Sequence, residues 1–188
     1  IETLQGYGLT ECAPLVAGNC DFYMNVNSAG KVMPGNEMKI DNPNAEGVGE
    51  ILTRGDNLML GYFNNPEATE AFKDGWFRTG DLGYIDKDGW LYIRGRSKNV
   101  IVTPNGKNIY PEELEERLGN CPEISEVIVV AGEDKNGETS VKAKIVANLE
   151  ELKAKFADLD INDPEAVKAK IKAVVDDIND KIPAYKKI

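Results

Sequence analysis

The sequence has 188 residues, 41% of them hydrophobic, which is enough for one domain of ordinary size or two small ones. Its formal net charge of −10 argues against a protein that binds nucleic acid or an anionic membrane through bulk charge. The sequence contains no histidine, which excludes a Ser-His-Asp triad within it and argues against a Cys/His zinc site.

The first half of the sequence is rich in glycine and aromatic residues and predicts short β-strands separated by turns. Strands are expected over residues 38–40, 49–54, 83–85 and 90–93. Asp88-Gly89, which precedes the last of these, is typical of a two-residue hairpin turn. A short helix is expected over residues 66–71, because Pro66 suits the first position of a helix. This half therefore predicts a small β-barrel or a strongly bent sheet.

The second half changes to an α+β pattern. Helices are expected to begin at Pro111 and at Pro164, where acidic residues follow and suit the N-terminal end of a helix dipole. Strands are expected over residues 126–131 and 141–147. The sequence pattern changes from β-rich to α+β near Lys98, so we predict one domain over residues 1–97 and a second over residues 98–188.

Three segments carry residue types that suit nucleotide chemistry. Residues 7–11 (YGLTE) offer an aromatic face, a hydroxyl and a carboxylate able to hold Mg²⁺, although such a segment taken alone is more often a glycine-rich turn with a capping threonine. Residues 76–82 (WFRTGDL) place Asp81 where it could accept two ribose hydroxyls or lie solvated in a surface turn. Residues 95–101 (GRSKNVI) contain Arg96, a donor for ribose or phosphate, and precede residues 105–115 (NGKNIYPEELE).

These segments, with residues 49–55 and 60–66 (LGYFNNP), resemble the adenylate-forming superfamily of acyl-CoA synthetases, firefly luciferase and peptide-synthetase adenylation domains. Residues 6–15 (GYGLTECAPL) and 103–111 (TPNGKNIYP) most resemble bacterial long-chain fatty acid–CoA ligases. The resemblance implies an α+β fold: the β-rich C-terminal piece of the large adenylating domain, followed by a small mobile α+β domain.

The resemblance also implies roles for five residues at a nucleotide site. Tyr7 would stack on adenine, and Thr10 would contact the phosphate. Glu11 would ligate Mg²⁺. Asp81 would hold the ribose hydroxyls, while Arg96 would support the ribose and phosphate.

Two further positions match the family's moving parts. Lys98 lies at the family's hinge, and Gly106 belongs to the loop that lines the tunnel for the pantetheine arm of CoA. The family's catalytic lysine is expected beyond Ile188, so neither Lys186 nor Lys187 is nominated. The phosphate loop is expected upstream of the sequence, which we take to be a piece of a longer protein and inactive alone.

The implied reaction is the ATP-dependent activation of a long-chain fatty acid to acyl-AMP, followed by transfer to CoA, with ATP or AMP, Mg²⁺ and CoA as ligands. Three alternatives stay open: an enzyme that activates a different acid, one that transfers the acyl group to a carrier protein, and a non-catalytic module with the same fold. So do acyl chain length, oligomeric state and peripheral membrane contact. No nucleic-acid partner is expected.

Two features bear on location in the cell. The cysteines, Cys12, Cys20 and Cys121, are odd in number and widely spaced, which favours unpaired thiols in a reducing compartment. No apolar run approaches the ~18–20 residues that span a bilayer, so no integral membrane segment is expected. We therefore expect a cytoplasmic protein.

Overall fold

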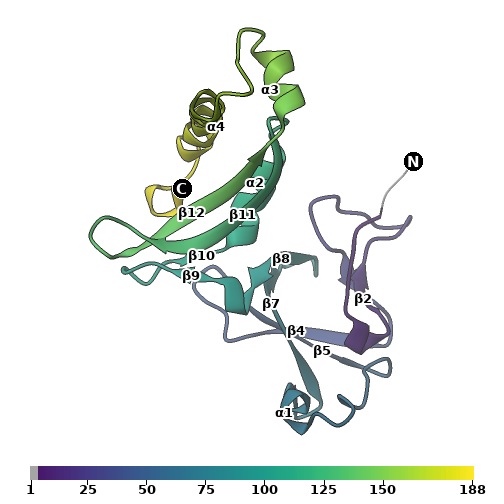
Figure 1. Cartoon of the computed structure of the whole chain (residues 1–188). Coiled ribbons are helices and arrows are strands. Elements are labelled where there is room, and N and C mark those ends of the chain that lie inside the picture. Colours follow the sequence, from purple (N-terminus) through teal and green to yellow (C-terminus); the bar gives the residue numbers. More distant parts are fainter. Residues whose placement is uncertain (1–3) are drawn as a thin grey trace. The chain divides into compact units, whose positions relative to one another are not determined.

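The computed structural model describes residues 4–188. The chain divides into two compact units, Ile1–Lys98 and Asn99–Ile188, and each is described by itself (Figure 1). The assignment of residues 1–97 to the end of a large nucleotide-binding domain, and of 98–188 to a mobile domain, stays a prediction.

The first unit contains two antiparallel sheets. A three-stranded sheet in the order β1-β2-β3 is formed by β1 (Gly6–Gly8), β2 (Leu15–Gly18) and β3 (Lys31–Val32). A five-stranded sheet in the order β4-β5-β7-β6, with β8 paired to β7, is formed by β4 (Asn36–Asp41), β5 (Gly49–Gly55), β6 (Phe72–Lys73), β7 (Trp76–Ile85) and β8 (Leu91–Arg96). Among the described residues both sheets are open. The predicted α+β fold class is confirmed. Of the two forms predicted for the first half of the chain, the structure shows the bent sheet and not the barrel.

Bulges explain the bend of the larger sheet. The register shifts between Glu50 and Leu52 on β5, and again between Leu82 and Gly83 on β7. Each shift inserts unpaired residues, which bends the strand and increases its twist. The buried positions of β7 nevertheless alternate along its length, so one face of the strand lies in the core.

The core of the first unit lies between the two sheets. Val16 and Ala17 of β2 are fully buried, and they pack in two clusters with Phe77 of β7 and with Ile51 of β5. Tyr7 contacts both clusters. The segment that contains Tyr7 is therefore held against the larger sheet by apolar burial.

The hairpin and the helix predicted in this unit are present, although the hairpin loop has three residues, 87–89, between the paired Asp86 and Trp90, and not two. Gly89 has φ +83°, and the Asp86 carboxylate accepts the backbone N–H groups of Asp88 and Trp90, which closes the hairpin between β7 and β8. Helix α1 (Pro66–Thr69) begins at the expected proline and ends two residues before the expected end. Short 3₁₀ turns lie at η1 (Thr10–Cys12) and η2 (Ser97–Asn99).

The second unit is a β-hairpin flanked by helices. Its elements are β9 (Ile101–Val102), β10 (Asn108–Ile109), α2 (Pro111–Gly119), β11 (Ile124–Glu133), β12 (Thr139–Ala147), α3 (Leu149–Lys155), α4 (Pro164–Asn179) and η3 (Ala184–Lys186). Both predicted strands are present and longer than expected, because polar residues extend the β11–β12 ladder from Ile124 to Glu133.

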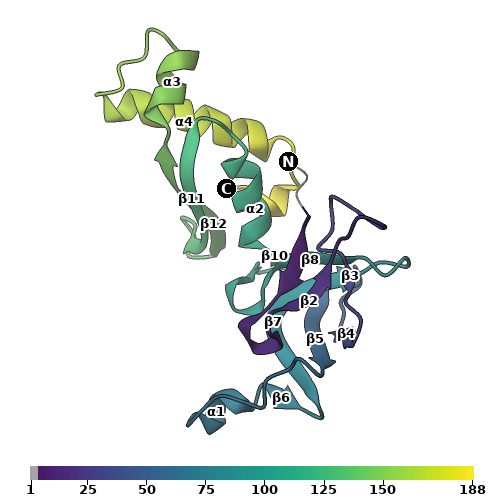
Figure 2. The same ribbon diagram turned by 90° about the vertical axis from the view of Figure 1, so that its right-hand side faces the viewer.

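One core joins the elements of the second unit. Helices α2 and α4 lie alongside the β11–β12 hairpin (Figure 2). Leu114 and Leu118 of α2 are fully buried and pack with Val129 of β11 and Ile178 of α4. None of the helices within residues 4–188 is long and apolar enough to cross a membrane.

Candidate functional site

Asp81 lies in a bulge of β7. The β5–β7 register passes from Glu50↔Leu82 directly to Leu52↔Arg78, so the three residues from 79 to 81 lie opposite one residue of β5. Gly80, in the middle, has φ +72°, a left-handed conformation that glycine adopts without steric cost. The bulge leaves the Asp81 side chain buried yet facing β8, where Arg96 is its partner in the register.

Two donors from distant parts of the chain converge on the Asp81 carboxylate. The Tyr7 hydroxyl donates to Oδ2 over 2.7 Å, and Arg96 Nε donates to Oδ1 over 2.8 Å. A carboxylate has about four lone-pair sites, so each oxygen can still accept a second hydrogen bond. The Asp81 carboxylate can therefore accept hydrogen bonds from the two hydroxyls of a diol while Tyr7 and Arg96 remain bound to it.

The electrostatics keep Tyr7 a donor. Burial raises the pKa of the Tyr7 phenol far above its usual value, and the adjacent negative charge of Asp81 raises it further. The phenol is therefore neutral over the physiological range. The Tyr7 ring packs against the core, and its hydroxyl donates a hydrogen bond to Asp81. These two contacts together fix the orientation of the ring.

Glu11 provides a second carboxylate, four residues after Tyr7 in the sequence. Its Oε1 accepts the Tyr62 hydroxyl over 2.6 Å. This hydrogen bond lowers the pKa of Glu11, and the Arg96 charge contributes to the same shift; in return the bond raises the pKa of Tyr62 to about 12. Thr10 precedes Glu11 in η1 and is exposed.

The donor set fits a magnesium ion that is bound mainly through phosphates. Mg²⁺ is usually held by one or two carboxylates together with substrate phosphates and water. Glu11 supplies one ionised carboxylate. Across residues 4–188 there is no group of three or more acidic or cysteine side chains that could hold a metal alone. Glu11 therefore fits such an ion only as part of a site completed by a phosphate.

Two further residues have a predicted role, Lys98 and Gly106. Lys98 is exposed in η2, at the last residue of the first unit. Gly106 lies in the second unit, in the turn between β9 and β10, where its N–H donates to the Thr103 carbonyl over 2.9 Å. Its φ is +71°, and a Cβ added there would meet no atom within 4 Å. The roles of these two residues stay predictions.

The structure thus brings Tyr7, Asp81 and Arg96 into direct contact, and it places Glu11 beside Tyr62. Sequence reasoning assigned no role to Tyr62 or to the residues that support the bulge. Tyr62 lies in the LGYFNNP stretch, which carried the family resemblance without a role for any side chain.

Comparisons with known proteins show which proteins this chain resembles. A family model described as AMP-binding enzyme matches residues 1–63. The long-chain-fatty-acid–CoA ligase FadD15 of Mycobacterium bovis is 46% identical over 127 residues, which make up 67% of this chain and 20% of that protein. The indoleacetate–CoA ligase of Aromatoleum aromaticum is 40% identical over 154 residues, which make up 78% of this chain and 30% of that protein.

A solved structure shows the same fold. The O-succinylbenzoate coenzyme A synthetase (MenE) of Bacillus subtilis, in complex with AMP, is 32% identical and superposes with a TM-score of 0.75. The match covers 98% of this chain and 35% of that protein. The chain therefore spans well under half the length of the proteins it matches.

Proposed function

We propose that this chain, which belongs to the adenylate-forming superfamily of AMP-binding enzymes, comes from an ATP-dependent acid–CoA ligase. The resemblance predicted from the sequence is confirmed at the level of the superfamily. The observation that supports the proposal most strongly is the buried Asp81 carboxylate, held by Tyr7 and Arg96 on two sides. This is an acceptor with its position fixed in advance and with spare hydrogen-bonding capacity.

Each residue of the cluster has a separate task in nucleotide binding. Asp81 accepts the ribose hydroxyls, and Arg96, which is half exposed, donates to the ribose and phosphate. The Tyr7 ring stacks on adenine, while its hydroxyl keeps the Asp81 carboxylate in place. Thr10 contacts the phosphate, and Glu11 would hold Mg²⁺, which would neutralise charge on the triphosphate.

The reaction takes place in two steps. An oxygen of the acid's carboxylate attacks the α-phosphorus of ATP, the bond to the β-phosphate oxygen breaks, and pyrophosphate leaves. The CoA thiolate then attacks the acyl carbonyl carbon, and AMP leaves with the electron pair of the broken C–O bond. Positioning and charge neutralisation supply most of the catalysis, because the protein forms no covalent bond.

The second unit serves the second step in this proposal. A hinge at Lys98 lets residues 98–188 present two faces to one active site in turn. The turn that contains Gly106 approaches the pantetheine arm of CoA, and the absence of a side chain there leaves the backbone open to close approach.

We assign a long-chain fatty acid as the substrate and the cytoplasm as the location. The assignment of a fatty acid rests on the similarity to the Mycobacterium bovis long-chain ligase. The similarity to the indoleacetate ligase supports a second class of acid, the aromatic acids. The location rests on three cysteines that are all unpaired. The ligands are therefore small molecules: fatty acid, ATP with Mg²⁺, and CoA.

The test uses the full-length ligase, meaning the protein that carries this chain. ATP–pyrophosphate exchange is measured with palmitate, indoleacetate and o-succinylbenzoate, followed by acyl-CoA formation with each acid. We expect exchange and thioester formation with palmitate and much less with the aromatic acids. Exchange with an aromatic acid alone would overturn the substrate and keep the enzyme class. Absence of exchange with every acid, in a folded protein that binds ATP, would favour a non-catalytic module.

A further inference from the structure

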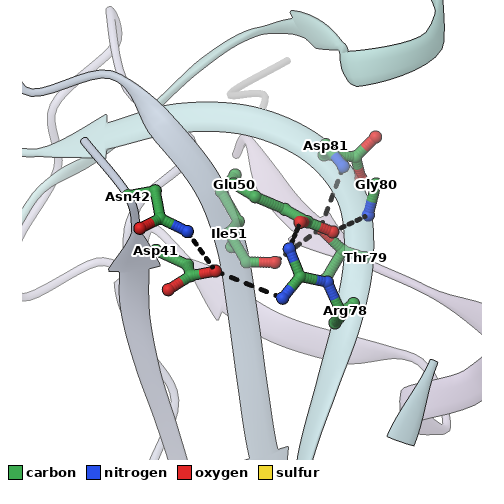
Figure 3. Close-up of polar contacts among 8 residues, drawn as sticks. All are labelled: Asp41, Asn42, Glu50, Ile51, Arg78, Thr79, Gly80 and Asp81. Carbon is green, nitrogen blue, oxygen red and sulfur yellow. Dashed lines mark hydrogen bonds and ion pairs between the residues drawn. The ribbon is translucent and has the colours of Figure 1, made fainter. Parts of the chain in front are cut away.

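Two carboxylates lie face to face on neighbouring strands beside the Asp81 bulge. Asp41 of β4 and Glu50 of β5 are direct partners in the register, an arrangement that costs free energy through like-charge repulsion. Arg78 of β7 contacts both carboxylates and offsets the repulsion, with its Nη1 3.2 Å from Asp41 Oδ2 and its Nη2 on Glu50 Oε2 (Figure 3).

A charged pair farther along the same two strands shows the simpler alternative. Glu37 and Arg54 are also direct partners on β4 and β5, and they form an ordinary cross-strand ion pair over 2.7 Å. That pair needs no third residue. A basic residue at position 50 could pair with Asp41 in the same way, so the presence of a glutamate there needs a separate explanation.

The second oxygen of Glu50 supplies that reason. Oε1 accepts the backbone N–H of Gly80 over 3.1 Å, across the bulge (Figure 3). Gly80 is half-buried and lies in the part of β7 where no ladder partner is available, and an unpaired amide that is shielded from water costs free energy. A lysine or arginine at position 50 could not accept this hydrogen bond.

Thr79 completes the support of the bulge. Its hydroxyl donates to the Ile51 carbonyl over 2.7 Å and accepts the Asp81 N–H over 3.0 Å. The amide N–H groups on either side of the Gly80 Cα, those of Gly80 and Asp81, are therefore held by side chains, one from β5 and one from β7. Side chains have replaced the missing ladder and fix the backbone that presents the Asp81 carboxylate.

We propose that Glu50 is a positioning residue of the nucleotide site: it holds the Gly80 amide and thereby sets where the Asp81 carboxylate meets the ribose. Arg78 and Asp41 keep the Glu50 side chain turned toward the bulge. The proposal rests on the nucleotide site proposed above. It adds a residue that touches neither nucleotide nor acid and acts through the backbone.

The test compares two variants of nearly equal length in the full-length ligase. Glu50→Gln and Glu50→Met both lose the charge that faces Arg78, but only the glutamine keeps an oxygen to accept the Gly80 N–H. AMP affinity is measured by calorimetry. We expect Glu50→Met to bind AMP about tenfold more weakly than Glu50→Gln. Glu37→Gln is the control, since it removes the charge of a cross-strand ion pair on the same two strands without touching Gly80 or Arg78, and its AMP affinity should stay within about twofold.

The same comparison on an Asp81→Ala background separates positioning from general stability. With the carboxylate removed, the Gln and Met variants at position 50 should bind AMP within about twofold of each other. An undiminished tenfold gap on that background overturns the proposal, as does equal affinity of the two variants when Asp81 is present. If Asp81→Ala alone leaves AMP affinity unchanged, the nucleotide site itself is wrong, which is a different outcome.

Amide exchange gives an independent readout should Glu50→Met bind no nucleotide at all. The Gly80 N–H should exchange faster with solvent in Glu50→Met than in Glu50→Gln, while amides of the β4–β5 ladder keep their protection. Uniform loss of protection across β4 and β5 means a folding defect, and it would overturn the assignment of Glu50 to positioning.

Discussion

Removing one hydroxyl tests whether Tyr7 supports Asp81. The substitution Tyr7→Phe keeps the ring, and with it the packing against the core and the proposed surface for adenine. It removes the 2.7 Å hydrogen bond to Asp81 Oδ2. Asp81 is only 6% exposed, so water cannot readily replace the lost donor. A hydrogen bond to a charged group contributes about 1.5–3 kcal/mol, and we expect the first unit to lose that amount of unfolding free energy near pH 8.

The pH dependence makes this prediction specific. Burial raises the pKa of Tyr7 above that of an unfolded tyrosine, which is about 10. The folded state therefore keeps its phenol proton where the unfolded state has lost it, so the stabilisation is complete below pH 10 and declines as the pH rises further. The slope approaches about 1.4 kcal/mol per pH unit for one proton. The variant lacks this titration, so the stability gap should close between about pH 10 and 12.

The assay is urea unfolding of the 188-residue chain, followed by tryptophan fluorescence from pH 8 to 11.5. The chain has two tryptophans, Trp76 and Trp90, and both lie in the first unit, so the signal reports that unit alone. Tyrosines other than Tyr7 titrate in both proteins and cancel in the difference. A gap that stays constant from pH 8 to 11.5, or no loss at pH 8, would refute the described role of the hydroxyl.

Three further predictions concern other parts of the chain. Tyr62→Phe removes the hydrogen bond that lowers the pKa of Glu11, so an NMR titration should show that pKa rising toward its ordinary value; an unchanged titration would mean that Tyr62 does not act on Glu11. In the full-length ligase, Lys98→Pro should fix the hinge, because proline locks φ near −65°, and should uncouple pyrophosphate exchange from thioester formation; two unaffected half-reactions would count against the hinge. Asn179→Leu removes both hydrogen bonds to the backbone of Ile188 and should lower the unfolding free energy of the second unit by about 1–3 kcal/mol, seen by circular dichroism; unaltered stability would contradict this.

Signals carried by neighbouring residues in the sequence predicted local structure well. Helices α1, α2 and α4 begin at Pro66, Pro111 and Pro164, and the Asp88-Gly89 turn joins two strands as expected. In each case the physical cause lies within a few residues: the fixed φ of proline, or the freedom of glycine at φ > 0. The ends of the elements were less predictable, because tertiary pairing decides how far a strand continues.

The support of the site could not be predicted from the sequence alone. Glu50 and Gly80 are 30 residues apart, and Tyr62 and Glu11 are 51 apart, so only the folded sheet brings them together. The β7 bulge depends on how β5 and β7 pair, and no local pattern encodes that register. Family motifs located Asp81 without revealing what holds it in place.

The most direct test of the account asks whether Asp81 recognises ribose hydroxyls. Calorimetry on the full-length ligase would compare ATP with 2′,3′-dideoxy-ATP, in the parent protein and in Asp81→Ala. The account predicts that the parent prefers ATP by about 10- to 150-fold, the value of hydrogen bonds to a charged acceptor, and that the variant binds both nucleotides about equally. Discrimination that survives the loss of Asp81 would contradict the central claim, because another group would then read the ribose.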